Sequence, residues 1–122
     1  MLKEAKLACQ AMDPEYEPQL CRLISAALIE MRTRGIDLKG EFTYTIGEVQ
    51  DPDDPEGETR LAVTEWECTI TDDWIKTTAL TWVKAKAPWT ENPEKLMDAY
   101  ENMLDKMMHT TGYHRGWETE DG

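Results

Sequence analysis

The chain has 122 residues, of which 25 are acidic and 13 basic, and it carries a formal net charge of −12. This length predicts one domain that buries a core without metal or disulfide support, and the charge disfavours binding to nucleic-acid phosphates or to anionic membranes. Charges among the first six residues and short apolar runs lead us to expect no signal peptide and no membrane segment. Three cysteines without a CxxC pair predict free thiols in a reducing compartment.

The negative charge is concentrated in the middle of the chain. Residues 41–73 hold eleven acidic side chains and a single base, Arg60, which together account for −10 of the net −12. The rest of the sequence holds 14 acids against 12 bases. This pattern indicates nearly neutral flanking segments around a separate acidic insertion.

Helical periodicity marks the segment before the insertion. A weak amphipathic stretch opens the chain, with apolar residues at Leu2, Ala5, Cys9 and Met12. Asp13-Pro14 predicts a turn, and we expect the regular helix to run from about Pro18 to a stop at Gly35. Its apolar stripe comprises Leu20, Leu23, Ile24, Ala27, Leu28 and Met31.

The insertion alternates with the period of a β-strand. Phe42, Tyr44 and Ile46 fall on one side of a first strand. The matching face of a second strand comprises Ala62, Thr64, Trp66, Cys68 and Ile70. Residues 50–58 are polar and proline-rich and predict a loop between the strands. A two-stranded hairpin is marginal in water, so we expect Phe42, Tyr44 and Trp66 to pack on the helices or on another subunit.

Two further helices are expected after the hairpin. Thr71-Asp72-Asp73 is acid-rich, which suits the N-terminus of a helix that Pro88 ends. Asn92-Pro93 then predicts the start of the last helix. The apolar positions are Trp74, Ile75, Ala79, Trp82 and Val83 in the first helix and Leu96, Tyr100, Met103, Leu104 and Met107 in the second.

The predicted fold class is therefore mainly α. It is a small four-helix domain with a β-hairpin inserted between the second and third helices, in the order α-α-β-β-α-α. The domain spans residues 1–113 and includes the acidic hairpin insertion at residues 40–70. Residues 114–122 are expected to form a flexible C-terminal tail.

No motif for catalysis or metal binding stands out. An EF-hand loop counted from Asp51 places Ala62 where the last glutamate ligand belongs, so the calcium pattern fails. Only His109 and His114 are close enough in sequence for a zinc ligand pair, and no cysteine lies in a nucleophile motif. There is no P-loop, no GxSxG and no GxGxxG. We expect no enzyme activity and no cofactor.

Tryptophans are the most informative side chains. Trp74 and Trp82 recur with helical spacing, which predicts core positions. Trp66 on the hairpin and Trp89 between two helices are harder to bury in one small domain. Because tryptophan is enriched at interface hot spots, these two indicate a surface for another subunit or partner.

Residues 2–36 and 72–114 resemble the head–tail connector (head completion) proteins of long-tailed bacteriophages. The matching features are an opening helix, acidic turn and second helix, then the Asp72 or Asp73 helix start, Trp82-Val83-Lys84-Ala85, Leu96 followed by Tyr100, and Thr111-Gly112-Tyr113. Residues 39–70 depart from the family in length and charge.

The resemblance implies a structural virion protein. Such proteins form a ring, commonly of twelve subunits, below the portal protein, where they extend the DNA channel and present a surface to the tail or to a second neck protein. It implies location in the virion neck, and in the host cytoplasm before assembly, with no cofactor, no membrane and no specific DNA binding. The candidate subunit or portal interface comprises Phe42, Tyr44, Trp66 and Trp89. The candidate acidic channel or docking loop comprises Asp51, Asp53, Asp54, Glu56 and Glu58.

Alternatives remain for the insertion and for the whole chain. The acidic loop either faces the channel, where it repels DNA phosphates, or docks on the portal. For the whole chain, one alternative to the connector function is an acidic DNA mimic that inhibits a DNA-binding protein or nuclease. Mimicry needs carboxylates spread over a surface, whereas here they are concentrated in one hairpin. An uncharacterised enzyme would need a concave pocket with perturbed titratable groups.

Overall fold

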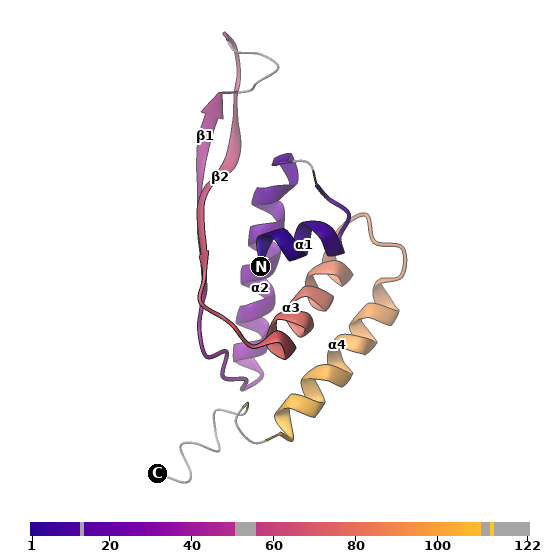
Figure 1. Ribbon diagram of the computed structural model, residues 1–122. Coiled ribbons are helices and arrows are strands. Elements are labelled where there is room, and N and C mark those ends of the chain that lie inside the picture. Colours follow the sequence, from indigo (N-terminus) through magenta and orange to yellow (C-terminus); the bar gives the residue numbers. More distant parts are fainter. Residues whose placement is uncertain (13, 51–55, 111–112, 114–122) are drawn as a thin grey trace.

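The computed structural model describes residues 1–12, 14–50, 56–110 and 113. In these residues the chain forms four α-helices and an antiparallel two-stranded β-hairpin between the second and third helices (Figure 1). The elements are α1 (Leu2–Ala8), the 3-10 turn η1 (Pro14–Tyr16), α2 (Glu17–Thr33), β1 (Phe42–Gln50), β2 (Thr59–Cys68), α3 (Asp73–Lys86) and α4 (Pro93–Met108). The mainly helical class and the predicted element order are confirmed.

Helix α2 begins and ends where the sequence predicts. The turn η1 precedes it, and Pro18 lies in its first turn, where a missing backbone N–H is harmless. At its end Gly35 has φ 97°, in the left-handed region that favours glycine. The Ile36 amide donates to the Met31 carbonyl at 3.1 Å and Ile36 is fully buried, which is the Schellman arrangement.

The first helix is shorter than its apolar pattern predicts. It ends at Ala8, and Gln10 then adopts φ 55°, which turns the chain out of the helical path. As a result Ala11 is buried at 2% exposure, while Met12 is 56% exposed. The prediction that Met12 lies on the apolar face is therefore wrong, because the helical phase does not continue to it.

The helices pack into one core around α3. Helix α3 lies between α2 and α4, and α1 packs against both α2 and α3 (Figure 1). Large side chains that are fully buried in this core are Leu20, Ile24, Met31, Ile75, Val83, Tyr100, Leu104 and Met107. Trp74 and Trp82 are half-buried against it. Each large buried apolar side chain contributes about 1.5–3 kcal/mol to folding, so these layers dominate the stability.

The hairpin packs on the helices at its base and extends beyond them at its tip. Both strands contact α2. Phe42 and Ile70 are buried at 8% and 2% exposure, and Tyr44 and Val63 pack partly against the same core. Figure 1 shows the distal part of both strands rising past the end of α2. The base of the hairpin is therefore supported by the chain's own helices.

A β-bulge changes the faces of the second strand. Tyr44 pairs with Trp66, but after an irregularity between Thr45 and Ile46, Ile46 pairs with Val63. One extra residue in β2 reverses which side chains share a face, since alternation has a period of two. The prediction that Ala62 and Thr64 share the face of Trp66 is therefore wrong beyond the bulge.

Candidate functional site

The described part of the hairpin presents carboxylates to solvent. The exposed acidic side chains are Glu41, Glu48, Glu56, Glu58, Glu65 and Glu67. The accompanying base, Arg60, is half-buried. Three residues of the predicted acidic loop, Asp51, Asp53 and Asp54, lie outside the described residues. The described part of the hairpin and its loop is thus a strongly negative surface even without Asp51, Asp53 and Asp54.

Three of the four predicted interface aromatics form a cluster on the hairpin. The ring centroid of Phe42 lies 5.9 Å from that of Tyr44 and 6.1 Å from that of Trp66. Phe42 is buried in the chain's own core, Tyr44 is half-buried, and Trp66 is 44% exposed. Trp66 therefore offers most of the aromatic surface available to a partner.

A shallow hollow lies beside the bulge, and acidic residues of β2 contribute to its lining. We call it the acidic hollow; its volume is about 510 Å³, and its lining includes Tyr44, Thr45, Thr64, Glu65, Trp66 and Glu67. Glu65 and Glu67 are exposed at their positions in β2. Because Glu67 pairs with Thr43 and Glu65 with Thr45, the two carboxylates lie on the face of the hairpin opposite the Tyr44–Trp66 pair.

The fourth aromatic residue, Trp89, lies away from this cluster and connects three segments. Its indole Nε1 donates to the Cys9 carbonyl at 2.9 Å, and its ring centroid lies 5.2 Å from that of Tyr16. These contacts tie the α3–α4 loop to the end of α1 and to η1. Trp89 is still 39% exposed, so it stabilises the fold and also offers surface.

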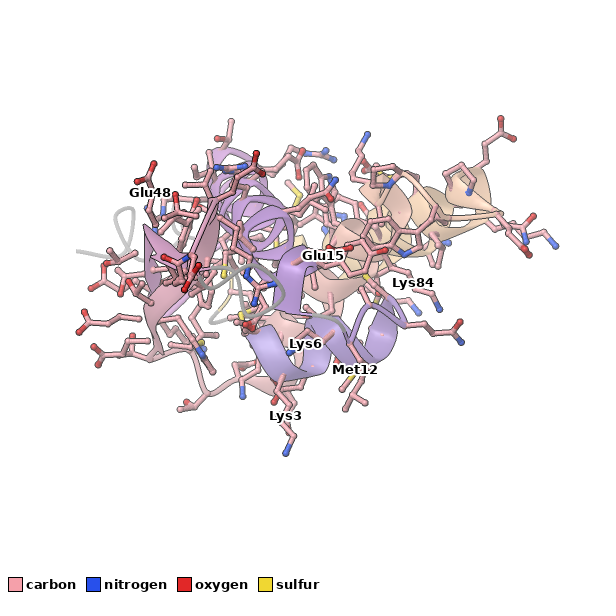
Figure 2. The ribbon with its side chains drawn as sticks, turned by 90° about the horizontal axis from the view of Figure 1, so that it is seen from above. Lys3, Lys6, Met12, Glu15, Glu48 and Lys84 are labelled. Carbon is pink, nitrogen blue, oxygen red and sulfur yellow. The ribbon has the colours of Figure 1, made fainter. Side chains whose placement is uncertain are left out.

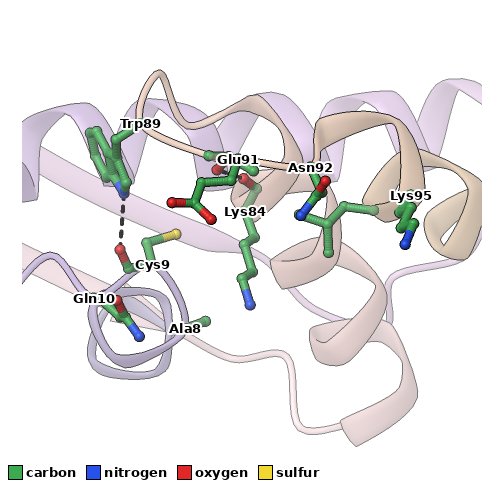
Figure 3. Close-up of a pocket in the computed structure, with 10 residues that line it drawn as sticks. Ala8, Cys9, Gln10, Lys84, Trp89, Glu91, Asn92 and Lys95 are labelled. Carbon is green, nitrogen blue, oxygen red and sulfur yellow. Dashed lines mark hydrogen bonds between the residues drawn. The ribbon is translucent and has the colours of Figure 1, made fainter.

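A second pocket lies beside Trp89. We call it the lysine pocket; its volume is about 490 Å³, and its lining includes Cys9, Gln10, Lys84, Trp89, Glu91 and Lys95. Figure 3 shows Lys84 extending from α3 into the space between α1 and the α3–α4 loop. Among the described residues, neither Lys84 nor Lys95 forms an ion pair. Two ammonium groups against the single carboxylate of Glu91 give this pocket a positive balance.

The acidic hollow and the lysine pocket belong to different sides of the molecule. In Figure 2, Glu48 on the hairpin and Lys84 on α3 lie on opposite sides, with α1 and α2 between them. In the N-terminal part of the chain, two apolar residues are strongly exposed, Leu7 at 59% and Met12 at 56%. Leu61 at 52% exposure accompanies Trp66 on the hairpin. Sequence patterns did not predict that Met12 and Leu61 are exposed, because the end of α1 decides the first and the β-bulge affects the second.

The buried thiols are unsuited to nucleophilic chemistry. Cys9 and Cys21 are buried, and Cys68 is half-buried. Burial, with a smaller contribution from the Glu17 carboxylate, raises the pKa of Cys21 to about 11. Burial also raises the pKa of Cys9 above its ordinary value, although Lys84 opposes the change. Both thiols therefore stay protonated at neutral pH, whereas attack requires the thiolate.

The described residues hold no group of three or more His, Cys, Asp or Glu side chains placed to bind a metal ion. Of the helices described, none has the length and apolar character needed to cross a membrane. Comparison of the chain with protein-family models, curated proteins and solved structures finds no match.

Proposed function

We propose that this protein is a head–tail connector of a long-tailed bacteriophage, a structural subunit that forms a ring below the portal. The observation that carries the proposal is the hairpin that rises past the helices with exposed carboxylates and an exposed indole. A projecting element of this kind is suited to contacts with neighbouring subunits. The resemblance of residues 2–36 and 72–114 to connector proteins supports the same assignment.

The acidic charge fits a ring through which DNA passes. Carboxylates repel phosphates, so a channel lined by acidic side chains lets the genome slide without binding. Docking of the same loop on the portal is the other placement. Both placements use the loop residues Asp51, Asp53 and Asp54.

The test is to interrupt the gene in a phage that encodes it and to examine the lysate by electron microscopy. We expect filled or leaking heads beside separate, normal tails, with wild-type protein supplied in trans restoring joined particles. Intact infectious particles without the protein would overturn the proposal. In that case competition with DNA for a basic DNA-handling protein would test the DNA-mimic alternative.

Complementation with a neutralised loop separates the two placements. The variant carries Asp51→Asn, Asp53→Asn and Asp54→Asn. If the loop docks on the portal, we expect fewer joined particles and normal DNA ejection from those that form. If the loop faces the channel, particles join normally and DNA ejection slows.

A further inference from the structure

One stretch of β2, residues 64–67, has exposed side chains on both faces of the hairpin. All four of its side chains are exposed, and no other run of this length in either strand is exposed throughout. The register pairs Trp66 with Tyr44 on one face. The Glu65 and Glu67 carboxylates lie on the other face, because successive side chains of a strand alternate. The described part of the chain therefore leaves this stretch of β2 largely uncovered.

The backbone of the same stretch has an unpaired edge. The sheet has two strands, so β2 has a hydrogen-bonded neighbour on one side only. The Thr69 amide donates to the Glu41 carbonyl at 2.9 Å. Since alternate residues of an antiparallel pair point their amides and carbonyls at the partner strand, those of Trp66 and Cys68 point away from β1. Among the described residues, neither makes a backbone–backbone hydrogen bond outside the hairpin.

A strand added at this edge would meet two different surfaces. Side chains directly opposite one another on neighbouring strands interact, so one face of the added strand lies beside Trp66 and the other beside Glu65 and Glu67. Apolar side chains suit the indole, and ammonium or guanidinium groups suit the carboxylates. We propose that β2 binds, as a third strand, an extended segment of another protein in which lysine or arginine alternates with apolar residues.

Charge argues against a second copy of this hairpin as the occupant. The two strands contain a single base, Arg60, and it is half-buried. Pairing β2 with the same strand of another copy would place Glu65 and Glu67 near like charges, which is repulsive. Lys84-Ala85-Lys86 has the alternating pattern, but it lies in helix α3 and is not available as a strand. The segment therefore belongs to a different protein, and this inference does not depend on the connector function.

Strand addition takes affinity from main-chain hydrogen bonds and specificity from alternate side chains, so pattern and backbone can be tested separately. The first probe is a short peptide of alternating lysine and valine with blocked ends, long enough to pair with residues 64–68. Its control has the same composition with the lysines and valines in separate blocks. Isothermal titration calorimetry at low salt compares them. We expect the alternating peptide to bind at least about tenfold more tightly, although the net charge attracts both.

Methylation of the peptide nitrogens tests pairing by the backbone. One alternating peptide is N-methylated at every lysine and a second at every valine. Because the amides of alternate residues point to the same edge of a strand, one pattern removes the donors that face β2 and the other leaves them. We expect one methylated peptide to lose binding by at least about tenfold while the other retains it. Nuclear magnetic resonance should place the largest shifts at residues 64–68.

Variants of the protein test the two faces. Glu65→Lys with Glu67→Lys should weaken binding of the alternating peptide at least about tenfold. The matched control is Asp98→Lys with Asp105→Lys, which changes the net charge equally at exposed positions of α4 and should bind as the wild type does. Trp66→Ala should weaken the alternating peptide more than the block peptide. Circular dichroism verifies that each variant is folded.

Several results would overturn the proposal. They are equal affinities for the alternating and block peptides, equal effects of the two methylation patterns, or equal weakening by the α4 control. Self-association that protects residues 64–68 from the peptide would assign the edge to a second copy instead. The connector function is tested separately in the phage, and loss of the gene gives its result whether or not the isolated chain binds the peptide.

Discussion

Asp72 connects the start of α3 to the last described residue of the chain. One carboxylate oxygen accepts hydrogen bonds from the amides of Trp74 and Ile75, at 2.9 and 3.0 Å. The other accepts from the Tyr113 hydroxyl at 2.8 Å. Tyr113 is held further by the Asp37 amide, which donates to its carbonyl at 2.7 Å. A helix cap predictable from local sequence thus also fixes a distant segment.

The charge of Asp72 makes this cap sensitive to pH. Burial alone would raise the pKa of Asp72, but hydrogen bonds from Ile75, Tyr113 and Trp74 outweigh burial and hold the pKa below its ordinary value of 3.8. A carboxylate with a lowered pKa in the folded state adds stability above its unfolded pKa. That stability is lost as the pH falls through the folded pKa.

We expect Asp72→Ala to lower the free energy of unfolding by about 1–2 kcal/mol, because it removes the cap. Asp72→Asn should cost less at neutral pH, since asparagine also caps helices. Urea unfolding over a pH series measures the free energy of unfolding of the wild type and of both variants. The difference between wild type and Asp72→Asn should shrink below a pH of about 4; a difference independent of pH would show that the charge has no role.

The hairpin depends on a close backbone approach at its base. A Cβ atom at Gly40 would lie 2.8 Å from the Ile70 nitrogen and 2.8 Å from the Thr69 carbonyl carbon. Both neighbours are backbone atoms, which cannot rotate away. At Gly47, within β1, a Cβ would instead meet the Thr64 Cγ2 at 3.3 Å, and that side chain can turn.

We therefore expect Gly40→Ala to destabilise the protein by about 1–3 kcal/mol through displacement of the strand next to Ile70. Gly47→Ala is the matched control, since it makes the same chemical change in the same hairpin. It should lower the free energy of unfolding by clearly less than Gly40→Ala. Chemical unfolding followed by tryptophan fluorescence compares the two variants. Equal costs would mean that the backbone contact at the base does not hold the hairpin in place.

Over the whole molecule, concentrated negative charge opposes folding. The net charge is −12, and most of it belongs to residues 41–73. Self-repulsion destabilises a compact state, and salt screens it between exposed groups. Ion pairs act in the opposite direction; Arg34 with Glu101, at 2.9 Å, is partly exposed and worth about 0–1 kcal/mol.

We expect added sodium chloride to raise the thermal midpoint of the dilute, monomeric protein. The increase should be smaller for Glu65→Gln with Glu67→Gln, because less repulsion then remains to be screened. Differential scanning fluorimetry over a salt series measures the thermal midpoints of both proteins. A midpoint that falls with salt would show that ion pairs outweigh repulsion in the single chain.

Local chemistry by itself determined the elements of this protein. Apolar spacing predicts α2, Gly35 ends it through a backbone conformation that glycine favours, and proline and acidic residues mark the starts of α3 and α4. Alternation predicts the hairpin, and charge counts alone locate the acidic surface. These signals are readable because each depends on residues close in sequence.

Only the tertiary structure decided which side chains meet and which remain exposed. The bulge moves Val63 opposite Ile46, and the early end of α1 exposes Met12. Trp89 reaches Cys9 across eighty positions of sequence. The separation of the acidic hollow from the lysine pocket likewise follows from helix packing. These features depend on contacts between residues far apart in sequence and on one-residue shifts in the helix or strand pattern. Local periodicity carries no information about either.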